Sequence, residues 1–302
     1  MRKKKKALRE SHFKGKRNVT LALPSTYKQF FAFTYRTNLL LVFKTSLMLS
    51  LFAIPLLIAL YARTRIVTGL TQNSGAEEVA ANVMGFQGWY GFVLLAAFLV
   101  FSIGATGALY VMKKHIFNEG VLFMRDFFAG IKKNGLGSLG ITLFYFGILA
   151  LLNYFINLFT FQSDIPYYAI LLVAFILISV LVYMMWVLSI MIHMIYTCPF
   201  GMLLKNSFLM MFGKLPINLL SLLCTAAPFI VVWAIGYAPV LYAFALAYVA
   251  ILFGNSALVV ALFNCYVFDE LVNKKQFPEA YRKGLFSGGQ KTVVDEGFGH
   301  DS

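Results

Sequence analysis

The glycine-rich segment 135–140 has a spacing that matches a motif with defined chemistry. It reads Gly-Leu-Gly-Ser-Leu-Gly, the pattern with which dinucleotide-binding folds hold a pyrophosphate. That chemistry needs a strand before the glycines, a helix after them and an acidic residue about 20 positions later. Here a basic segment precedes the glycines, an apolar segment follows, and residues 141–162 contain no acid. We therefore interpret the glycines as positions where helices pack closely, and we expect no cofactor.

Histidines and cysteines, which supply most metal ligands and many nucleophiles, are scattered along the chain. Cys198, Cys224 and Cys265 match no zinc or redox spacing, and the four histidines form no metal-binding pattern. His193 alone lies inside an apolar segment, where a satisfied polar residue explains it better than a proton relay. The apolar segments contain no Asp or Glu, which proton-coupled transporters usually bury. The sequence therefore predicts no metal site and no enzyme activity.

Three further polar residues in apolar segments are candidates for lining a cavity or a solute path. Asn153 and Asn157 lie four residues apart, so they share one helix face and either line a cavity or hydrogen-bond between helices. Thr106 lies in the small-residue stretch 104–108, where its hydroxyl can bond to a backbone carbonyl. Tight helix packing explains this stretch better than a substrate notch.

The composition shows which kind of element must position these residues. The 302-residue chain is 60% hydrophobic and 13% charged, whereas soluble domains are typically about 45–50% apolar and about 25% charged. Both differences indicate burial in lipid. The net charge of +14 would suggest nucleic-acid binding in a soluble protein. Here the positive residues lie in the tails and in alternate loops, so we expect contact with anionic lipid head groups and no nucleic acid.

Six apolar segments have lengths near the roughly 20 residues that cross a bilayer core. They are Asn38–Tyr61, Trp89–Met112, Leu136–Thr160, Tyr167–Ile195, Ile217–Ile235 and Val240–Asn264. The sequence therefore predicts an all-α fold, a polytopic membrane bundle of six transmembrane helices within residues 27–272. A disordered basic leader (1–26) precedes the bundle, and a cytoplasmic tail (273–302) follows it.

The positive residues predict the orientation of the bundle. The chain has 26 Lys and Arg residues, and only Arg63 and Arg65 lie on one side of the six predicted helices. Because Lys and Arg are strongly enriched in cytoplasmic loops, the other side is the cytoplasmic one. We expect a multi-pass protein of the cell membrane with both termini in the cytoplasm.

Three aromatic and basic connectors precede the first, third and fifth segments, and we interpret the segments as three hairpins. The connectors end at Asn38, Asn134 and Asn218, each of which we expect to cap the next helix. The middle connector (121–133) has an apolar stripe, with Arg125, Asp126 and two lysines on another side, as in an interfacial elbow helix. It either packs under the bundle or docks a partner. Its candidate interaction face is Lys113, Lys114, Arg125, Asp126, Phe127, Phe128, Lys132 and Lys133.

The stretch 104–134 joins a small-residue turn, a basic pair, a second turn, an aromatic elbow and a second basic pair. In order these are Ala105-Thr106-Gly107-Ala108-Leu109, Lys113-Lys114, Asn118-Glu119-Gly120, Asp126-Phe127-Phe128 and Lys132-Lys133. In these features the chain resembles the YesL-like family of bacterial integral membrane proteins of unknown function. Members often occur beside sugar-uptake transporters and their regulators in Gram-positive bacteria, so the resemblance implies a link to carbohydrate uptake. It brings no catalytic residues.

Two functions remain open at this point. The first is a non-enzymatic accessory or scaffold that works with subunits of a sugar-uptake transporter or with a membrane sensor. The alternative is a small-solute, sugar-type permease, which small-residue helices, intramembrane asparagines and a repeated hairpin would suit. Since any compact bundle needs small residues, the lack of acids in the apolar segments discriminates better, and it favours the accessory.

Overall fold

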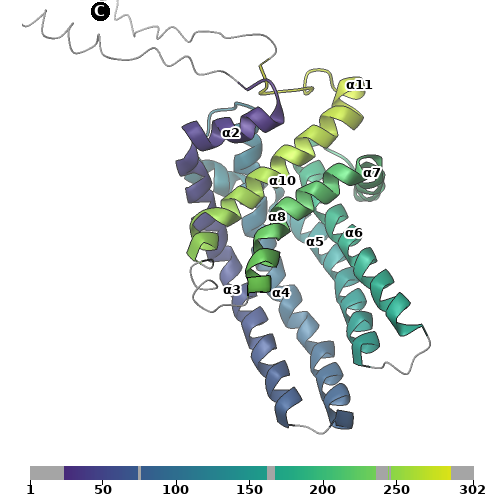
Figure 1. Cartoon of the computed structure of the whole chain (residues 1–302). Coiled ribbons are helices and arrows are strands. Elements are labelled where there is room, and N and C mark those ends of the chain that lie inside the picture. Colours follow the sequence, from purple (N-terminus) through teal and green to yellow (C-terminus); the bar gives the residue numbers. More distant parts are fainter. Residues whose placement is uncertain (1–23, 74–75, 162–166, 236–243, 245, 287–302) are drawn as a thin grey trace, which may run out of the picture.

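The computed structural model describes residues 24–73, 76–161, 167–235, 244 and 246–286, and the regular elements in this part of the chain are all helical. Figure 1 shows them as one elongated bundle, with α2 and α11 at the end where the described chain starts and stops. This arrangement confirms the predicted all-α bundle. Residues 1–23 of the predicted leader and 287–302 of the predicted tail lie outside the described residues.

Five helices of the described chain are long and apolar enough to cross a membrane. Four are α3 (Leu39–Asn73), α4 (Ala76–Ile116), α5 (Phe123–Phe161) and α6 (Tyr168–Ile195), and the fifth candidate span is Tyr248–Gln276. A sixth span results if α7 (Phe200–Gly213) and the first part of α8 (Leu215–Ile235) count together, although these two helices meet at 91°. The predicted segment Val240–Asn264 lies partly outside the described residues, and its helix continues past Asn264.

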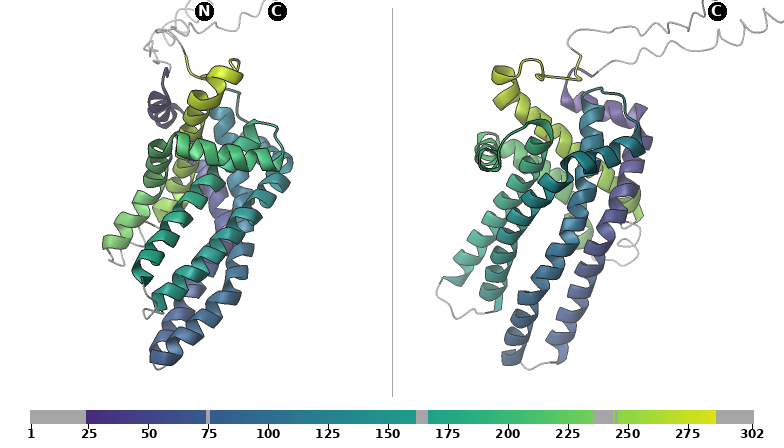
Figure 2. Two further views of the ribbon diagram at one scale, coloured as in Figure 1. Left: turned by 90° about the vertical axis from the view of Figure 1, so that its right-hand side faces the viewer. Right: turned by 180° about the vertical axis from the view of Figure 1, so that it is seen from behind.

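The α3–α4 hairpin is longer than the sequence predicted. α3 continues past Tyr61 to Asn73, and α4 begins at Ala76 rather than at Trp89. Residues 76–82 read Ala-Glu-Glu-Val-Ala-Ala-Asn, and Ala and Glu are strong helix formers. The helix therefore does not stop where the apolar run stops. Figure 2 shows that the hairpin reaches beyond α5 and α6, on the side away from α2.

Two of the three predicted connectors are separate helices. α2 (Tyr27–Thr37) precedes α3, and α7 precedes α8. The middle connector is helical from Phe123, as predicted, but it is the first part of α5, which runs unbroken from Phe123 to Phe161. It is therefore not a separate helix. The chain breaks after α7 because Pro216, at the start of α8, has no N–H with which to continue the α7 ladder. Residues 123–161 contain no proline.

The three asparagines do not cap the helices that follow them. The Asn38 N–H closes the end of α2 by donating to the Thr34 carbonyl. Asn134 lies within α5, and its side-chain amide donates to the Gly130 carbonyl at 3.3 Å. Asn218 donates to the carbonyls of the last turn of α7, at 3.1 and 3.2 Å. The predicted side-chain caps are therefore wrong. The Asn134 and Asn218 side chains bond to carbonyls of the preceding turns, and the Asn38 side-chain amide donates to the Thr37 hydroxyl at 3.1 Å.

Small residues bring the helices close together. A Cβ atom at Gly104 in α4 would collide with Phe52 of α3. A Cβ atom at Gly254, in α10 (Phe253–Phe268), would collide with the backbone carbonyl of Val42. The interpretation of residues 104–108 as a tight-packing stretch is therefore confirmed.

The two ends of the described chain meet at one end of the bundle. The fifth candidate span consists of η1 (Tyr248–Leu252), α10, η2 (Asp269–Asn273) and α11 (Lys274–Gln276). Residues 277–286, here called the C-terminal strap, then turn back towards α2. The Phe286 N–H donates to the Pro24 carbonyl at 3.0 Å, and Lys283 forms an ion pair with Glu119 at 2.7 Å. The strap therefore links the start of the described chain to the turn after α4.

Candidate functional site

The start of α5 presents two sides of very different character. Asp126 is buried and forms an ion pair with Lys114 at 2.9 Å. Its carboxylate also accepts a 2.8 Å hydrogen bond from the Leu122 N–H. Phe127 is completely buried beside Phe52, whose ring centre lies 5.9 Å away. Asp126 and Phe127 therefore hold α5 against α3 and α4, and the prediction that Asp126 belongs to the exposed basic side is wrong.

The remaining residues of the predicted interaction face divide into an exposed set and a set that packs inward. Arg125, Phe128, Lys132 and Lys133 are exposed, and we call these four residues the basic face of α5. Their three cations form no ion pair within the described part of the chain. Lys113 belongs to the set that packs inward: it lies on α4, and its ammonium group is 5.6 Å from the Tyr110 ring centre.

Thr106 and His193 have structural partners. Thr106 is buried, and its hydroxyl donates to the Ser102 carbonyl at 2.8 Å, as the sequence predicted. His193 makes a backbone hydrogen bond with Asn134, and its ring lies where a Cβ atom at Gly137 would be. The middle glycine of the GxGxxG stretch therefore makes room for the imidazole ring, which gives this glycine a packing role.

Asn153 and Asn157 belong to a polar network between α3, α4 and α5. The Asn157 amide donates to the Asn153 carbonyl at 2.6 Å, and its oxygen accepts a 3.3 Å hydrogen bond from Gln87. Gln87 in turn accepts a 3.1 Å hydrogen bond from the Arg63 guanidinium group. Asn157 therefore acts in helix association, whereas Asn153 contributes its backbone carbonyl within α5. Neither residue lines the central cavity described next.

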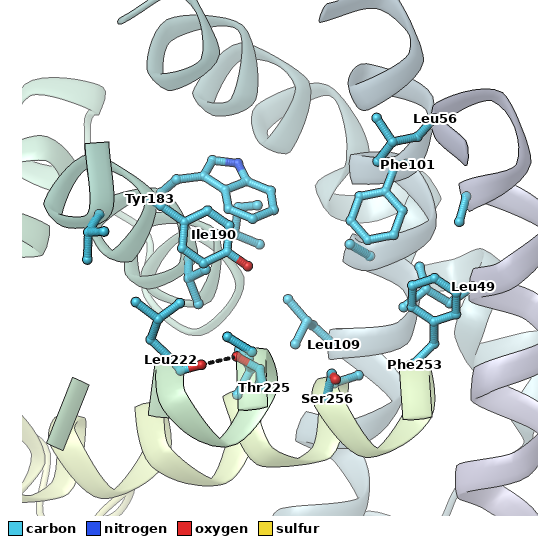
Figure 3. A pocket seen from close by; sticks show the side chains of 18 of the residues that line it. Leu49, Leu56, Phe101, Leu109, Tyr183, Ile190, Leu222, Thr225, Phe253 and Ser256 are labelled. Carbon is cyan, nitrogen blue, oxygen red and sulfur yellow. Dashed lines mark hydrogen bonds between the residues drawn. The ribbon is translucent and has the colours of Figure 1, made fainter. Parts of the chain in front are cut away.

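A cavity of about 640 Å³ is lined by residues of α3, α4, α5, α6, α8, η1 and α10, and we call it the central cavity. Figure 3 shows aliphatic and aromatic side chains around it, with the Tyr183 hydroxyl pointing inward. Thr225 and Ser256 add hydroxyl groups, and the Thr225 hydroxyl donates to the Leu222 carbonyl at 2.9 Å. The residues that line the cavity carry no charge. This lining suits an apolar guest.

The buried carboxylate of Asp269, which no sequence pattern had indicated as a site, connects the helix bundle to the C-terminal strap. Asp269 is 4% exposed and accepts hydrogen bonds from the Tyr27 hydroxyl at 2.7 Å, the Asn273 amide at 2.8 Å and the Arg282 N–H at 2.9 Å. Burial, together with the nearby Asp269 carboxylate, raises the pKa of Tyr27. The phenol therefore stays a donor at neutral pH.

The sequence offered only part of this cluster. Asp269 and Asn273 lie four residues apart on one helix. Tyr27, however, is 242 residues from Asp269, and no local pattern pairs positions so distant. Asp269 also lies just beyond the predicted end of the last apolar segment, so the expected absence of acids covered a shorter stretch than the span Tyr248–Gln276.

Comparisons of the chain with protein-family models, with curated proteins and with solved structures find no match. The class that fold and site define is an all-α protein with helices long and apolar enough to cross a membrane. Its candidate sites are the basic face of α5 and the central cavity.

Proposed function

We propose that the protein is a non-enzymatic membrane accessory or scaffold that binds an acidic segment of a partner on the basic face of α5. The observation behind this proposal is that the Asp126 side chain points inward, where it forms an ion pair with Lys114. Because the only acid of residues 121–134 is removed from the surface, the face carries three cations and no anion. Such a face attracts acidic segments and anionic lipids, and it repels basic ones.

The support behind this face also favours a docking role. α5 is one continuous helix, and Asp126 and Phe127 anchor its first turns against the neighbouring helices. Arg125, Phe128 and Lys132 follow one another at intervals of three and four residues, so they lie on the same side. A face that is ordered before binding loses little conformational entropy when a partner docks.

The partner class comes from the resemblance to the YesL-like family. We propose a subunit of a sugar-uptake transporter, or a membrane sensor of the same system, with an acidic segment on the side of the chain termini. The accessory role also agrees with the chemistry of the central cavity. A sugar inside it would leave many hydroxyl groups without hydrogen bonds, at a cost of about 1–3 kcal/mol each. A sugar permease is therefore the weaker candidate.

Site-specific photo-crosslinking in cells tests the docking role. A benzophenone amino acid replaces Phe128, which is 50% exposed, and the matched control carries it at Phe92, which is 74% exposed on α4. We expect position 128 to capture a transporter or sensor subunit that position 92 does not capture. Charge reversal by Lys132→Glu with Lys133→Glu should reduce the capture at least tenfold. Crosslinks from position 128 to lipid alone, or to the same proteins as from position 92, would refute the proposal.

Transport assays address the alternative directly. Proteoliposomes that contain only this protein are expected to take up radiolabelled mono- and disaccharides no faster than empty liposomes. Saturable sugar uptake by the protein alone would establish the permease function and exclude the accessory role as the primary one.

A further inference from the structure

A second, much smaller cavity adjoins the central cavity. It has a volume of about 30 Å³, which exceeds the roughly 10–15 Å³ that a water-sized group needs. Five of its lining residues also line the central cavity: Tyr183, Val187, Leu222, Thr225 and Val260. The two spaces therefore share a wall, and the small one has room for a single hydroxyl-sized group.

One of the residues that line the small cavity has a buried acceptor without a partner. Asn264 lines it, and this residue is only 4% exposed. The Asn264 amide nitrogen donates to the Val260 carbonyl at 2.7 Å, but the Oδ1 atom has no hydrogen-bond partner among the described residues. Buried acceptors in proteins are nearly always paired. The Oδ1 atom is therefore free to accept a hydrogen bond from a donor in the adjoining space.

A hydrogen-bond donor stands beside the same space. Tyr183 lines both cavities, and Figure 3 shows its hydroxyl directed into the central one. A guest hydroxyl can both donate and accept, so one such group where the two cavities meet could pair with Asn264 and Tyr183 together.

We propose that the two cavities form one site for a neutral lipid with a free hydroxyl group, such as a long-chain or isoprenoid alcohol. The hydrocarbon tail occupies the central cavity, and the hydroxyl lies where the two cavities meet, where it donates to Asn264 Oδ1 and accepts from Tyr183. The volume of the central cavity falls in the range of small-molecule sites, about 300–1,000 Å³. This site is separate from the basic face of α5, so it does not depend on the docking function.

The lining selects against the other lipids of the bilayer. Neither cavity is lined by a charged residue, so a phosphate, carboxylate or ammonium head group would be buried there without a counter-ion. A simple hydrocarbon or an ether-capped tail would fill the central cavity but would leave the Asn264 oxygen unpaired. The donor on the guest is therefore the property that the site recognises.

Photolabelling of the full-length protein in nanodiscs tests this selectivity. The probes are a sixteen-carbon alcohol with a diazirine in its tail and the methyl ether of the same alcohol, each at the same mole fraction in the lipid. The ether has the same tail but cannot donate. We expect the alcohol to label residues of the central cavity about tenfold more strongly than the ether, which corresponds to one buried hydrogen bond. Equal labelling by the two probes would mean that ordinary acyl chains fill the cavity, and it would overturn the proposal.

Variants assign the selectivity to the residues named. Asn264→Leu should reduce the alcohol-to-ether ratio to below about twofold, because the acceptor is lost. The matched control is Ser138→Ala, which removes another buried and unpartnered polar atom that lines neither cavity, and it should keep the full ratio. A ratio that survives Asn264→Leu would refute the role of Asn264. If Asn264→Leu does not fold, Tyr183→Phe is the test variant. It should weaken labelling by both probes several-fold. Unchanged labelling in Tyr183→Phe would refute the proposed lipid site.

Discussion

Replacing Tyr27 by Phe should release the C-terminal strap and α2 from the end of the bundle. The substitution removes one hydroxyl, which donates to the buried Asp269 carboxylate at 2.7 Å. Hydrogen bonds to charged groups contribute about 1.5–3 kcal/mol each. Asp269 keeps its two other donors, Asn273 and the Arg282 N–H, so the cluster is weakened and not abolished. The expected loss of 1.5–3 kcal/mol corresponds to an open state that is about 10- to 150-fold more populated.

Limited proteolysis with trypsin measures this population. The bond after Arg282 lies in the strap, and the rate of its cleavage follows the population of the open state when opening is fast relative to cleavage. Tyr281→Phe is the matched control, because the Tyr281 hydroxyl has no hydrogen-bond partner in the described chain. We expect faster cleavage in Tyr27→Phe and the wild-type rate in Tyr281→Phe. Cleavage of Tyr27→Phe within twofold of the wild-type rate would refute the assignment of the Tyr27–Asp269 bond as the tie.

Three further outcomes are expected. The stability difference between wild type and Tyr27→Phe, measured from denaturation midpoints, should be constant up to about pH 10 and shrink above it. The pKa of Tyr27 is raised in the folded state, so the contribution of Tyr27 to stability is complete only below its pKa in the unfolded chain, which is about 10. Gly254→Ala should destabilise the bundle by about 1–3 kcal/mol, since its Cβ meets backbone, whereas Gly140→Ala, with open space around it, should stabilise by about 0.5–1 kcal/mol. In a cysteine-free background, Ser74→Cys should react with an impermeant thiol reagent outside intact cells and Ser287→Cys should not; the reverse pattern would overturn the charge-based orientation.

The helical membrane-type architecture was readable from the sequence because it depends on local properties. Long apolar runs and the scarcity of charge predict helices that bury themselves in lipid, whatever the helices later contact. The small-residue stretch 104–108 was interpreted correctly for a related reason, since few residue types allow two helix backbones to approach. The ends of helices were less well predicted, because residues 62–73 and 76–88 remain helical after the apolar pattern fades.

Tertiary structure alone decided which polar residues have partners. Asp126 points inward because Lys114 of α4 forms an ion pair with it. Asp269 links α2 to the end of the bundle because the hydroxyl of Tyr27, 242 residues away in the sequence, donates to it. The same holds for Asn264, the last residue of a predicted apolar segment, whose side-chain oxygen has no partner among the described residues and which lines a cavity. Helix periodicity places a side chain on a face, but the contact it makes there depends on which distant helix packs against that face. The sequence therefore determined the kind of protein, and only the packed helices determined which polar side chains are paired and which are exposed.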